Sequence, residues 1–342
     1  MKLAWIVNRL ITDNIGDQLI GISHKRLLKK IGYQVTQFEY QGHNRNKKLT
    51  YLDRAIWKLL SPDLFYFLKV IRTLPTAIKA APDVITIGGG QLLLQRPSCI
   101  PPLLAWYLVA RIIGAKFVLF SVGLEAESST KKIRNFIYRK ITKLVVQKAD
   151  DVYVRDIETK LFLKRVGCTR NLRISPDCAY SSVNHTPEVL QRSGVILTLA
   201  NRKIFEHYNV NGASWYEHIE NICLKVKEHL GDNENLYLAH TTAPDFESQS
   251  EILNDLNKFL NINILHFPKQ LDLDEYINLA SSSRLIIASR MHALIIGEIS
   301  GAEAAPIIIN KKLLNYSSNL GDRNTTQLSS ELWLCAKEAY EW

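Results

Sequence analysis

Short apolar runs rich in β-branched residues alternate with amphipathic stretches along this chain. In the first half, the runs predict strands at residues 3–7, 35–40, 84–87, 116–121, 151–154 and 173–175. Apolar residues at helical spacing predict helices between them, most clearly over residues 17–31 and 129–148. Strands that alternate with helices indicate βαβ units, and therefore an α/β fold with a parallel sheet covered by helices.

The pattern pauses in the polar stretch YSSVNHTPEVLQRSG and then starts again. The second half predicts strands at residues 195–199, 236–239, 263–267, 285–288 and 306–309. A length of 342 residues favours two domains, with one large α/β domain as the alternative. We place the boundary near residue 185, which gives domains 1–185 and 186–325. We interpret residues 326–342 as a helix that packs back toward the first domain.

The most apolar stretch is IPPLLAWYLVARIIGAKFVLFSVG, which Arg111, Gly114 and Lys116 interrupt. We interpret it as a buried helix followed by a buried strand, not as a membrane span. The first residues, MKLAWIVNRL, lack the apolar core and small-residue cleavage site of a secretory signal. The five cysteines are scattered and form no C-x-x-C pair. This argues against a disulfide framework or a zinc site and fits a reducing cytoplasm.

The net charge of +10 is unevenly distributed. Residues 1–183 contain 30 Lys and Arg against 13 Asp and Glu, a net charge of +17, whereas residues 184–342 carry −7. A basic first half indicates an anionic partner (a membrane surface, a diphosphate-linked substrate or nucleic acid) or simply a solvated basic face. Residues 44–82 mix Lys and Arg with aromatic residues. They fit a segment on a membrane surface and, equally well, an insertion packed on the first domain.

Glycines follow several of the predicted strands. In parallel sheets ligands bind at the carboxyl ends of the strands. Glycine there lets backbone amides approach a ligand and adopts positive φ. Glycines stand at these ends at Gly16, Gly88, Gly89, Gly90 and Gly123. Tight βα turns also need glycine, so each motif alone is weak evidence, and no G-x-G-x-x-G indicates a dinucleotide.

Cationic side chains at the same strand ends are more informative. They are Arg155, Arg202, Lys203, Arg290, His292, Lys311 and Lys312. The dipole at a helix N-terminus disfavours a cation, so we expect an anion to compensate each of them. An Arg paired with a local Asp, as Arg155 beside Asp156, is the plainer alternative. The stretch Ser289-Arg290-Met291-His292 thus predicts anion ligands at the mouth of a cleft.

An ordered set of motifs resembles the polysaccharide pyruvyl transferase family. The set comprises Asn14-x-Gly16-Asp17, Gly88-Gly89-Gly90-x-Leu92, Ser121-x-Gly123, Val154-Arg155-Asp156-x-x-Thr159, Pro176-Asp177 and Ser289-Arg290-Met291-His292-Ala293. It extends from residue 14 to about residue 312. Met291 replaces the usual Leu, the short Gly-x-Pro of the family is the longer GAEAAP here, and the basic residue after the next strand is Lys311 or Lys312.

The resemblance implies two Rossmann-like domains facing across a cleft, as in GT-B glycosyltransferases. It implies that phosphoenolpyruvate is the donor and that a sugar of a surface polysaccharide, or of its lipid-linked precursor, is the acceptor. The basic first domain would then face the acceptor, and the second domain the donor. We expect a cytoplasmic enzyme with peripheral contact to anionic membrane, no cofactor beyond phosphoenolpyruvate as co-substrate, no metal and no nucleic-acid partner; the oligomeric state stays open.

Phosphoenolpyruvate carries a phosphate and a carboxylate, so we assign its binding to cations. The expected donor ligands are Arg155, Arg202, Arg290, Lys311 and Lys312. The expected acceptor or loop residues are Asn14, Gly16, Gly88, Gly89, Gly90, Gly123 and Asp177. We assign His292 as the acid that protonates the methylene carbon, with His240 and Asp17 as its competitors. We expect Arg290 to stabilise the departing phosphate and Asp17 to position the acceptor hydroxyl, as a base.

Two other functions fit the same residues. A GT-B fold that binds a nucleotide-sugar also needs cations for the diphosphate, so Arg290 and His292 do not exclude a glycosyltransferase. A non-catalytic binding protein recruited through its basic half is the second alternative, in which Arg290 would be dispensable. We find no zinc-finger or RNP-like motif that favours nucleic acid.

Overall fold

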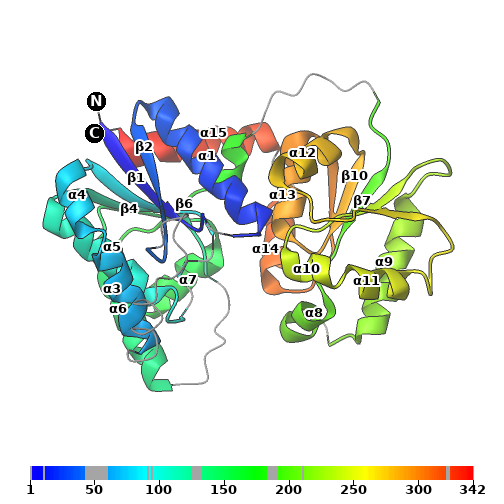
Figure 1. The fold of residues 1–342 in the computed structure, drawn as a ribbon, viewed down its shortest axis with the longest axis horizontal. Helices are drawn as coiled ribbons and strands as arrows, with labels where there is room; N and C mark the ends of the chain where they lie inside the picture. The colour runs from blue at the N-terminus through cyan, green and yellow to red at the C-terminus, as the bar shows by residue number, and fades with distance from the viewer. Residues whose placement is uncertain are drawn as a thin grey trace. The chain divides into compact units, whose positions relative to one another are not determined.

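The chain folds into two α/β units, each built on its own parallel sheet (Figure 1). The computed structural model describes residues 2–10, 12–42, 61–90, 92–93, 95–124, 132–182, 191–209, 212–320 and 324–341. The first unit contains Met1–Thr12, Asp17–Ser181 and Leu328–Trp342; the second contains Asp13–Gly16 and Ser182–Gln327. The chain therefore passes between units four times: after Thr12, after Gly16 within the Asn14-x-Gly16-Asp17 motif, after Ser181, and after Gln327 within the last helix.

The first unit has a six-stranded parallel sheet in the order β2-β1-β3-β4-β5-β6. The strands are β1 (Leu3–Asn8), β2 (Gln34–Glu39), β3 (Val84–Gly88), β4 (Lys116–Val122), β5 (Asp151–Val154) and β6 (Arg173–Ile174). The helices are α1 (Ile15–Ile31), α3 (Pro62–Ile71), α4 (Leu74–Ala80), α5 (Ile100–Ile113), α6 (Lys132–Lys148), α7 (Ile157–Arg165), the 3-10 turn η1 (Cys178–Ser182) and α15 (Thr325–Tyr340). Helices α1 and α15 cover one face of the sheet, and α3, α5 and α6 the other (Figure 1).

The second unit has a five-stranded parallel sheet in the order β11-β10-β7-β8-β9. The strands are β7 (Val195–Thr198), β8 (Leu236–Leu238), β9 (Ile264–His266), β10 (Leu285–Ala288) and β11 (Glu303–Pro306). The helices are α8 (Arg202–Tyr208), α9 (Trp215–His229), α10 (Ala243–Glu247), α11 (Gln249–Leu256), α12 (Leu273–Ser282), α13 (Met291–Ser300) and α14 (Lys311–Leu320). In both units the strand order reverses next to the first strand, which creates a switch point where ligands bind in such sheets.

The predicted α/β fold is confirmed, but the last strand was placed wrongly. The apolar run 306–309 suggested a buried strand, whereas β11 is Glu303–Pro306 and pairs with β10 from Leu285↔Glu303 to Ala288↔Pro306. This strand lies at a sheet edge and is only partly buried, so its pairing does not follow hydrophobicity. Pro306 lacks an N–H and closes the ladder at the last position.

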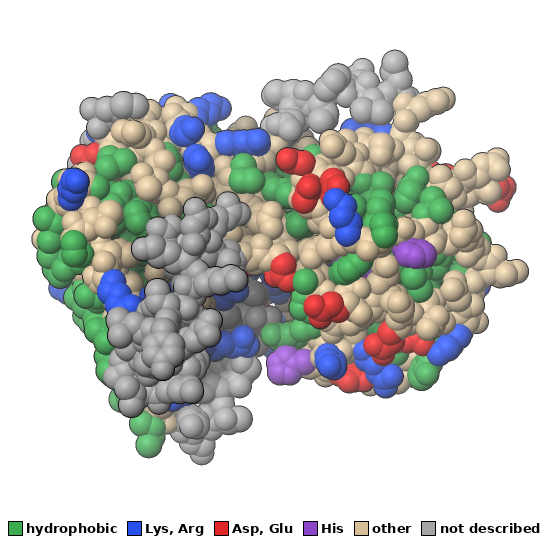
Figure 2. Space-filling view, in the orientation of Figure 1, with side chains coloured by type: hydrophobic (Ala, Val, Ile, Leu, Met, Phe, Trp, Pro, Cys, Tyr) green, Lys and Arg blue, Asp and Glu red, His purple; other side chains and the backbone are tan. Residues whose placement is uncertain are grey.

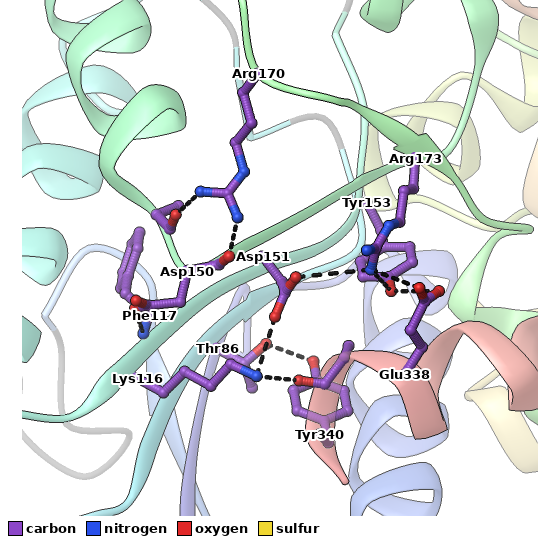
Figure 3. A network of polar contacts seen from close by, with 12 residues as sticks. Thr86, Lys116, Phe117, Asp150, Asp151, Tyr153, Arg170, Arg173, Glu338 and Tyr340 are labelled. Atoms are coloured by element: carbon purple, nitrogen blue, oxygen red, sulfur yellow. Dashed lines mark hydrogen bonds and ion pairs between the residues drawn. The ribbon is translucent and has the colours of Figure 1, made fainter. Parts of the chain in front are cut away.

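Helix α15 is fixed to the first unit by a polar network and a buried tyrosine (Figure 3). Lys116 Nζ lies 2.9 Å from the Ala339 carbonyl and 3.0 Å from Asp151, and Arg173 pairs with Glu338 at 2.9 Å. The Tyr340 hydroxyl lies 2.7 Å from Thr86 Oγ1 and 2.9 Å from His24 Nε2. The C-terminal helix thus completes the face of the sheet that α1 covers.

The apolar stretch after residue 99 is the buried helix α5 followed by β4. Trp106, Val109 and Ala110 of this helix are inaccessible to solvent, and Gly114 ends it at φ 73°. Among the described residues, we find no helix with both the length and the apolar character needed to cross a bilayer. Part of the basic stretch 44–82 lies outside the described residues; its described helices α3 and α4 pack on α5.

Candidate functional site

Arg290 is joined to the buried carboxylate of Asp245 at the switch point of the second sheet. Its Nε and Nη2 donate to the two oxygens of Asp245 at 2.8 and 2.7 Å. Asp245 is fully buried and also accepts from the Asn201 amide and from the Thr242 hydroxyl. Arg290 is the N-cap of α13, which agrees with its expected place between a strand end and a helix start, and its side chain is 24% exposed. An internal carboxylate therefore supplies the compensating anion that we expected from a ligand.

His292 lies in the first turn of α13, against the loop that contains Asn14 and Gly16. A β-carbon on Gly16 would stand 2.2 Å from the His292 Nδ1, so only glycine allows this approach. The Gly16 amide donates to Asn14 Oδ1 at 2.9 Å, and the Ile15 amide donates to the Thr241 carbonyl at 3.0 Å. The Asn-x-Gly motif thus has a physical basis: a local turn that fits under the imidazole.

His240 follows β8 and is the other histidine of this cluster. Burial lowers its pKa to about 4, which the Asp245 carboxylate opposes and Arg290 reinforces. At neutral pH the imidazole is therefore uncharged in nearly every molecule. His240 is therefore a poor source of a proton in the unliganded protein.

The remaining predicted cations of the second unit have separate locations. Arg202 pairs with Glu206 at 2.7 Å on the exposed side of α8 and does not join the Asp245 network. Lys311 and Lys312 begin α14, which Asn310 caps through the Leu313 amide at 2.9 Å. Lys203 is exposed on α8. Their contact with a donor stays a prediction.

Arg155 of the first unit is buried against carboxylates. Only 4% of its side chain is exposed; Nη1 lies 3.4 Å from Asp177, and Nε lies 3.5 Å from Asp156. Its Nη2 is buried and makes no hydrogen bond with a described residue. A β-carbon at Gly123 would stand 2.3 Å from Nε, so Gly123 makes room for the guanidinium. The structure thus joins Gly123, Arg155 and Asp177, three residues that sequence reasoning assigned separately.

A small pocket opens at the β1/β3 switch point of the first sheet. It has a volume of about 10 Å³, roughly the space of one water molecule. Its lining consists of Asn8, Arg9, Asp17, Ile20, Gly88, Gly89, Gly90 and Leu92. The side chain of Asn8 is 2% exposed, and neither of its polar atoms hydrogen-bonds to a described residue. These orphaned atoms fit a site that receives an oxygen atom of a ligand.

The three glycines of this pocket differ in purpose. A β-carbon would stand 1.9 Å from the His24 ring at Gly88 and 2.0 Å from Ile20 at Gly89, so these two glycines allow α1 to pack closely. Gly90 has φ 72° and meets only Asp17 Oδ1, at 3.9 Å. Only Gly90 therefore faces the pocket in the manner expected of a ligand-binding glycine.

Arg9 is a site residue that the sequence analysis did not select. Burial acts to lower its pKa, but Cys99 and the Asp17 carboxyl raise it overall, so the guanidinium is charged. Nη2 contacts the Cys99 sulfur at 3.9 Å, and the buried Nε makes no hydrogen bond with a described residue. Its position directly after β1 could have marked it as a site residue. Asp245 and Asn201 lie far along the chain from Arg290, and nothing in the sequence indicates that they contact it.

The comparison with protein families matches residues 14–310 to the polysaccharide pyruvyl transferase model. The chain belongs to this family. The match spans the loop under His292, the Arg155 cluster and the Arg290–Asp245 pair, so it includes parts of both units. None of the curated proteins compared with the chain matches it.

Solved structures with a similar fold include a UDP-GlcNAc 2-epimerase and a glycosyltransferase. UDP-GlcNAc 2-epimerase from Methanocaldococcus jannaschii aligns over 100% of both chains at 13% identity and a TM-score of 0.58. A glycosyltransferase from Rickettsia africae aligns over 99% of this chain and 93% of its own at 15% identity and a TM-score of 0.51. At such low identities the likeness shows the fold alone: two Rossmann-like regions of the GT-B type.

Proposed function

We propose that this family member transfers the pyruvyl group of phosphoenolpyruvate to a sugar of a surface polysaccharide or of its lipid-linked precursor. A proton adds to the methylene carbon of the donor, and a sugar hydroxyl attacks C2. Inorganic phosphate leaves, a second hydroxyl of the same sugar attacks C2, and the two hydroxyl protons are released as the ketal closes. Phosphoenolpyruvate enters as co-substrate, and the reaction as written needs no resident cofactor.

The contact between Gly16 and His292 is the observation that carries the proposal. It brings two motifs of the family, 276 residues apart in the chain, into one place. The chain continues from Gly16 directly into Asp17, our candidate for orienting the acceptor hydroxyl. Because Asp17 directly follows the residue that contacts His292, the chain itself supports a role for both side chains in one reaction, His292 toward the donor and Asp17 toward the acceptor.

His292 is the preferred proton donor. It shares the start of α13 with Arg290, so one short segment supplies both an acid and a cation for the phosphate. The low pKa of His240 argues against the competitor. Arg155 and Arg290, each oriented by a buried aspartate, are the cations we assign to the carboxylate and phosphate of the donor.

We assign an acceptor oxygen to the pocket formed by Asn8, Arg9, Asp17 and Gly90. An amide, a guanidinium and a carboxylate together offer both donors and acceptors to a sugar hydroxyl. The net positive charge of the first half fits an acceptor carried on a lipid diphosphate at the inner face of the plasma membrane.

Incubation with phosphoenolpyruvate and a panel of glycans tests the proposal. We expect release of inorganic phosphate and a glycan that gains one pyruvyl group, as read by mass spectrometry. A thermal-shift comparison of phosphoenolpyruvate with UDP-sugars provides the control. Stabilisation by a UDP-sugar alone, with transfer of a sugar, would favour the glycosyltransferase alternative.

A further inference from the structure

Helices α3, α5 and α6 form a large apolar groove on the first unit that the proposed reaction does not use. Its volume is about 830 Å³, and its apolar lining includes Leu64, Phe67, Leu104, Ile133, Ile137 and Ile141. Ligand cavities of this kind span about 300–1,000 Å³. The groove is therefore large enough for an apolar group the size of a lipid chain.

Helix α6 presents a second apolar stripe to solvent beside the groove. Its inner face is buried through Val145 and Val146, as expected of a helix on a sheet. Its outer face also carries apolar side chains: Ile133 is 79% exposed, Phe136 62% and Ile137 50%. Figure 2 shows hydrophobic side chains along this border of the first unit, over α4, α5 and α6. Contiguous exposed apolar surface marks an interaction site in soluble proteins.

The charged side chains around this stripe indicate what kind of partner it binds. Helix α6 has six Lys and Arg and no Asp or Glu: Lys132, Arg134, Arg139, Lys140, Lys143 and Lys148. The single acidic residue of α3, Asp63, is paired with Arg134 at 3.6 Å and also accepts from the Tyr138 hydroxyl. Apolar side chains bordered by cations, with the nearby carboxylate already paired, match an anionic bilayer surface.

Lys140 illustrates how the two features combine. Its Nζ lies 5.3 Å from the centre of the Phe136 ring, so the lysine stem covers apolar surface while the charge reaches water. This is the arrangement that side chains adopt at a membrane interface, with the ring below the headgroups and the ammonium among them.

We propose that the α3–α6 groove and the exposed stripe of α6 dock the first unit on an anionic lipid bilayer. Ile133, Phe136 and Ile137 enter the headgroup region, and the exposed Arg139 and Lys140 contact lipid phosphates. Docking through this surface brings the first unit to the membrane that carries the lipid-linked acceptor of the proposed function. It is tested without any substrate, so it stands or fails separately from the reaction.

Vesicle flotation of the full chain tests this surface. We expect binding to vesicles of phosphatidylcholine with one-quarter phosphatidylglycerol, and much weaker binding to phosphatidylcholine alone. Phe136→Ser combined with Ile137→Ser should weaken partition at least tenfold, and Lys140→Glu about tenfold or more, since each basic residue contributes about fivefold. Leu224→Ser, which changes a leucine of similar exposure on α9, is the matched control and should bind as the wild type.

Three results would overturn the inference. The first is that the double variant binds vesicles as well as the wild type does. The second is that the wild type binds neutral and anionic vesicles equally. The third is that light scattering shows a dimer for the wild type and a monomer for the double variant. The last result would assign the face to a second copy of the chain. Circular dichroism of each variant separates lost binding from lost folding, and phosphate release with a soluble glycan acceptor reports the proposed reaction independently.

Discussion

The α-carbon of Gly16 packs so closely on the ring of His292 that a β-carbon would lie 2.2 Å from Nδ1 and 2.6 Å from the His292 Cβ. The contact involves the base of the imidazole side chain, which has little freedom to move. It defines the orientation of the residue that we assign as the general acid. The loop with Asn14 is therefore a positioning element for the chemistry.

Gly16→Ala should displace His292 and lower turnover by at least about 100-fold, because general-acid catalysis contributes about 10²–10⁴-fold. The φ of Gly16 lies outside the left-handed region, so a backbone effect does not confuse the result. Gly231→Ala serves as the control, since the heavy atoms nearest its new β-carbon all belong to the Glu234 side chain, the closest at 3.3 Å. Wild-type turnover of Gly16→Ala with unchanged thermal stability would refute the positioning role.

His292→Gln should retain phosphoenolpyruvate affinity and lose turnover by about 10²–10⁴-fold, whereas His240→Gln should lose much less. Calorimetric titration of the donor and phosphate-release kinetics distinguish binding from catalysis. Loss of donor affinity with surviving turnover at saturation would make His292 a phosphate ligand. The acid would then be elsewhere.

Arg290→Ala removes one partner of a buried ion pair and should destabilise the second unit by about 3–5 kcal/mol. It should also weaken donor binding by about 1.5–3 kcal/mol, the range for hydrogen bonds to charged groups. Asp245→Asn provides the comparison: it should lower the unfolding midpoint but keep the guanidinium, and so impair donor binding less. Equal donor affinity in Arg290→Ala and the wild type would leave Arg290 a purely structural role.

Arg9→Met should raise the acceptor KM at least about tenfold and leave phosphoenolpyruvate affinity unchanged. The substitution preserves much of the side-chain volume but removes a buried charge from the pocket with Asp17. Arg111→Met, at a partly exposed arginine paired with Asp150, controls for the general loss of positive charge. A change in donor affinity alone would move this pocket to the donor side.

Three buried histidines predict loss of stability in acid. Burial lowers the pKa of His24 to about 3, of His218 to about 4 and, together with Arg290, of His240 to about 4. These groups stay neutral in the folded state, whereas the unfolded chain takes up protons below about pH 6.5. These histidines therefore do not lower the free energy of unfolding above about pH 6.5. Below it, the free energy of unfolding falls as the pH drops toward 4.

His218→Phe should reduce this pH dependence by about 1.1 kcal/mol between pH 6 and 5, because it removes the uptake of most of one proton on unfolding. The ring stacking on Phe205, at 4.1 Å between centroids, accommodates phenylalanine. Urea unfolding at the two pH values gives the slope, and His266→Gln, at an exposed histidine, is the control. An unchanged slope in His218→Phe would contradict the linkage.

The sequence predicted most strands because buried parallel strands are apolar runs that end at turns. It failed at β11, an edge strand whose position depends on pairing with β10. The sequence also placed Arg155, Arg290 and His292 correctly at the carboxyl ends of strands. It did not reveal that Asp245 lies 45 residues from Arg290 and binds it, or that the Asn14–Gly16 loop belongs with the second unit. Such contacts are tertiary, and neither periodicity nor composition encodes them.

Arg9 shows a different limit. Its place after β1 was evident, but an arginine in that position is ordinary until the structure shows it buried beside Asn8, with an Nε that makes no hydrogen bond to any described residue. Burial of a polar atom depends on what covers it, which here includes the turn at Gly88–Gly90 and the start of α1.

The central claim, pyruvyl transfer through protonation of the methylene carbon, is tested most directly by running the reaction in D₂O. With phosphoenolpyruvate and an accepted glycan, mass spectrometry should show a ketal whose methyl group carries one deuterium, formed together with inorganic phosphate. The His292→Gln variant should form this product at a rate lower by about 10²–10⁴-fold. A glycan that gains no pyruvyl group, or a ketal without deuterium in its methyl group, would contradict the account.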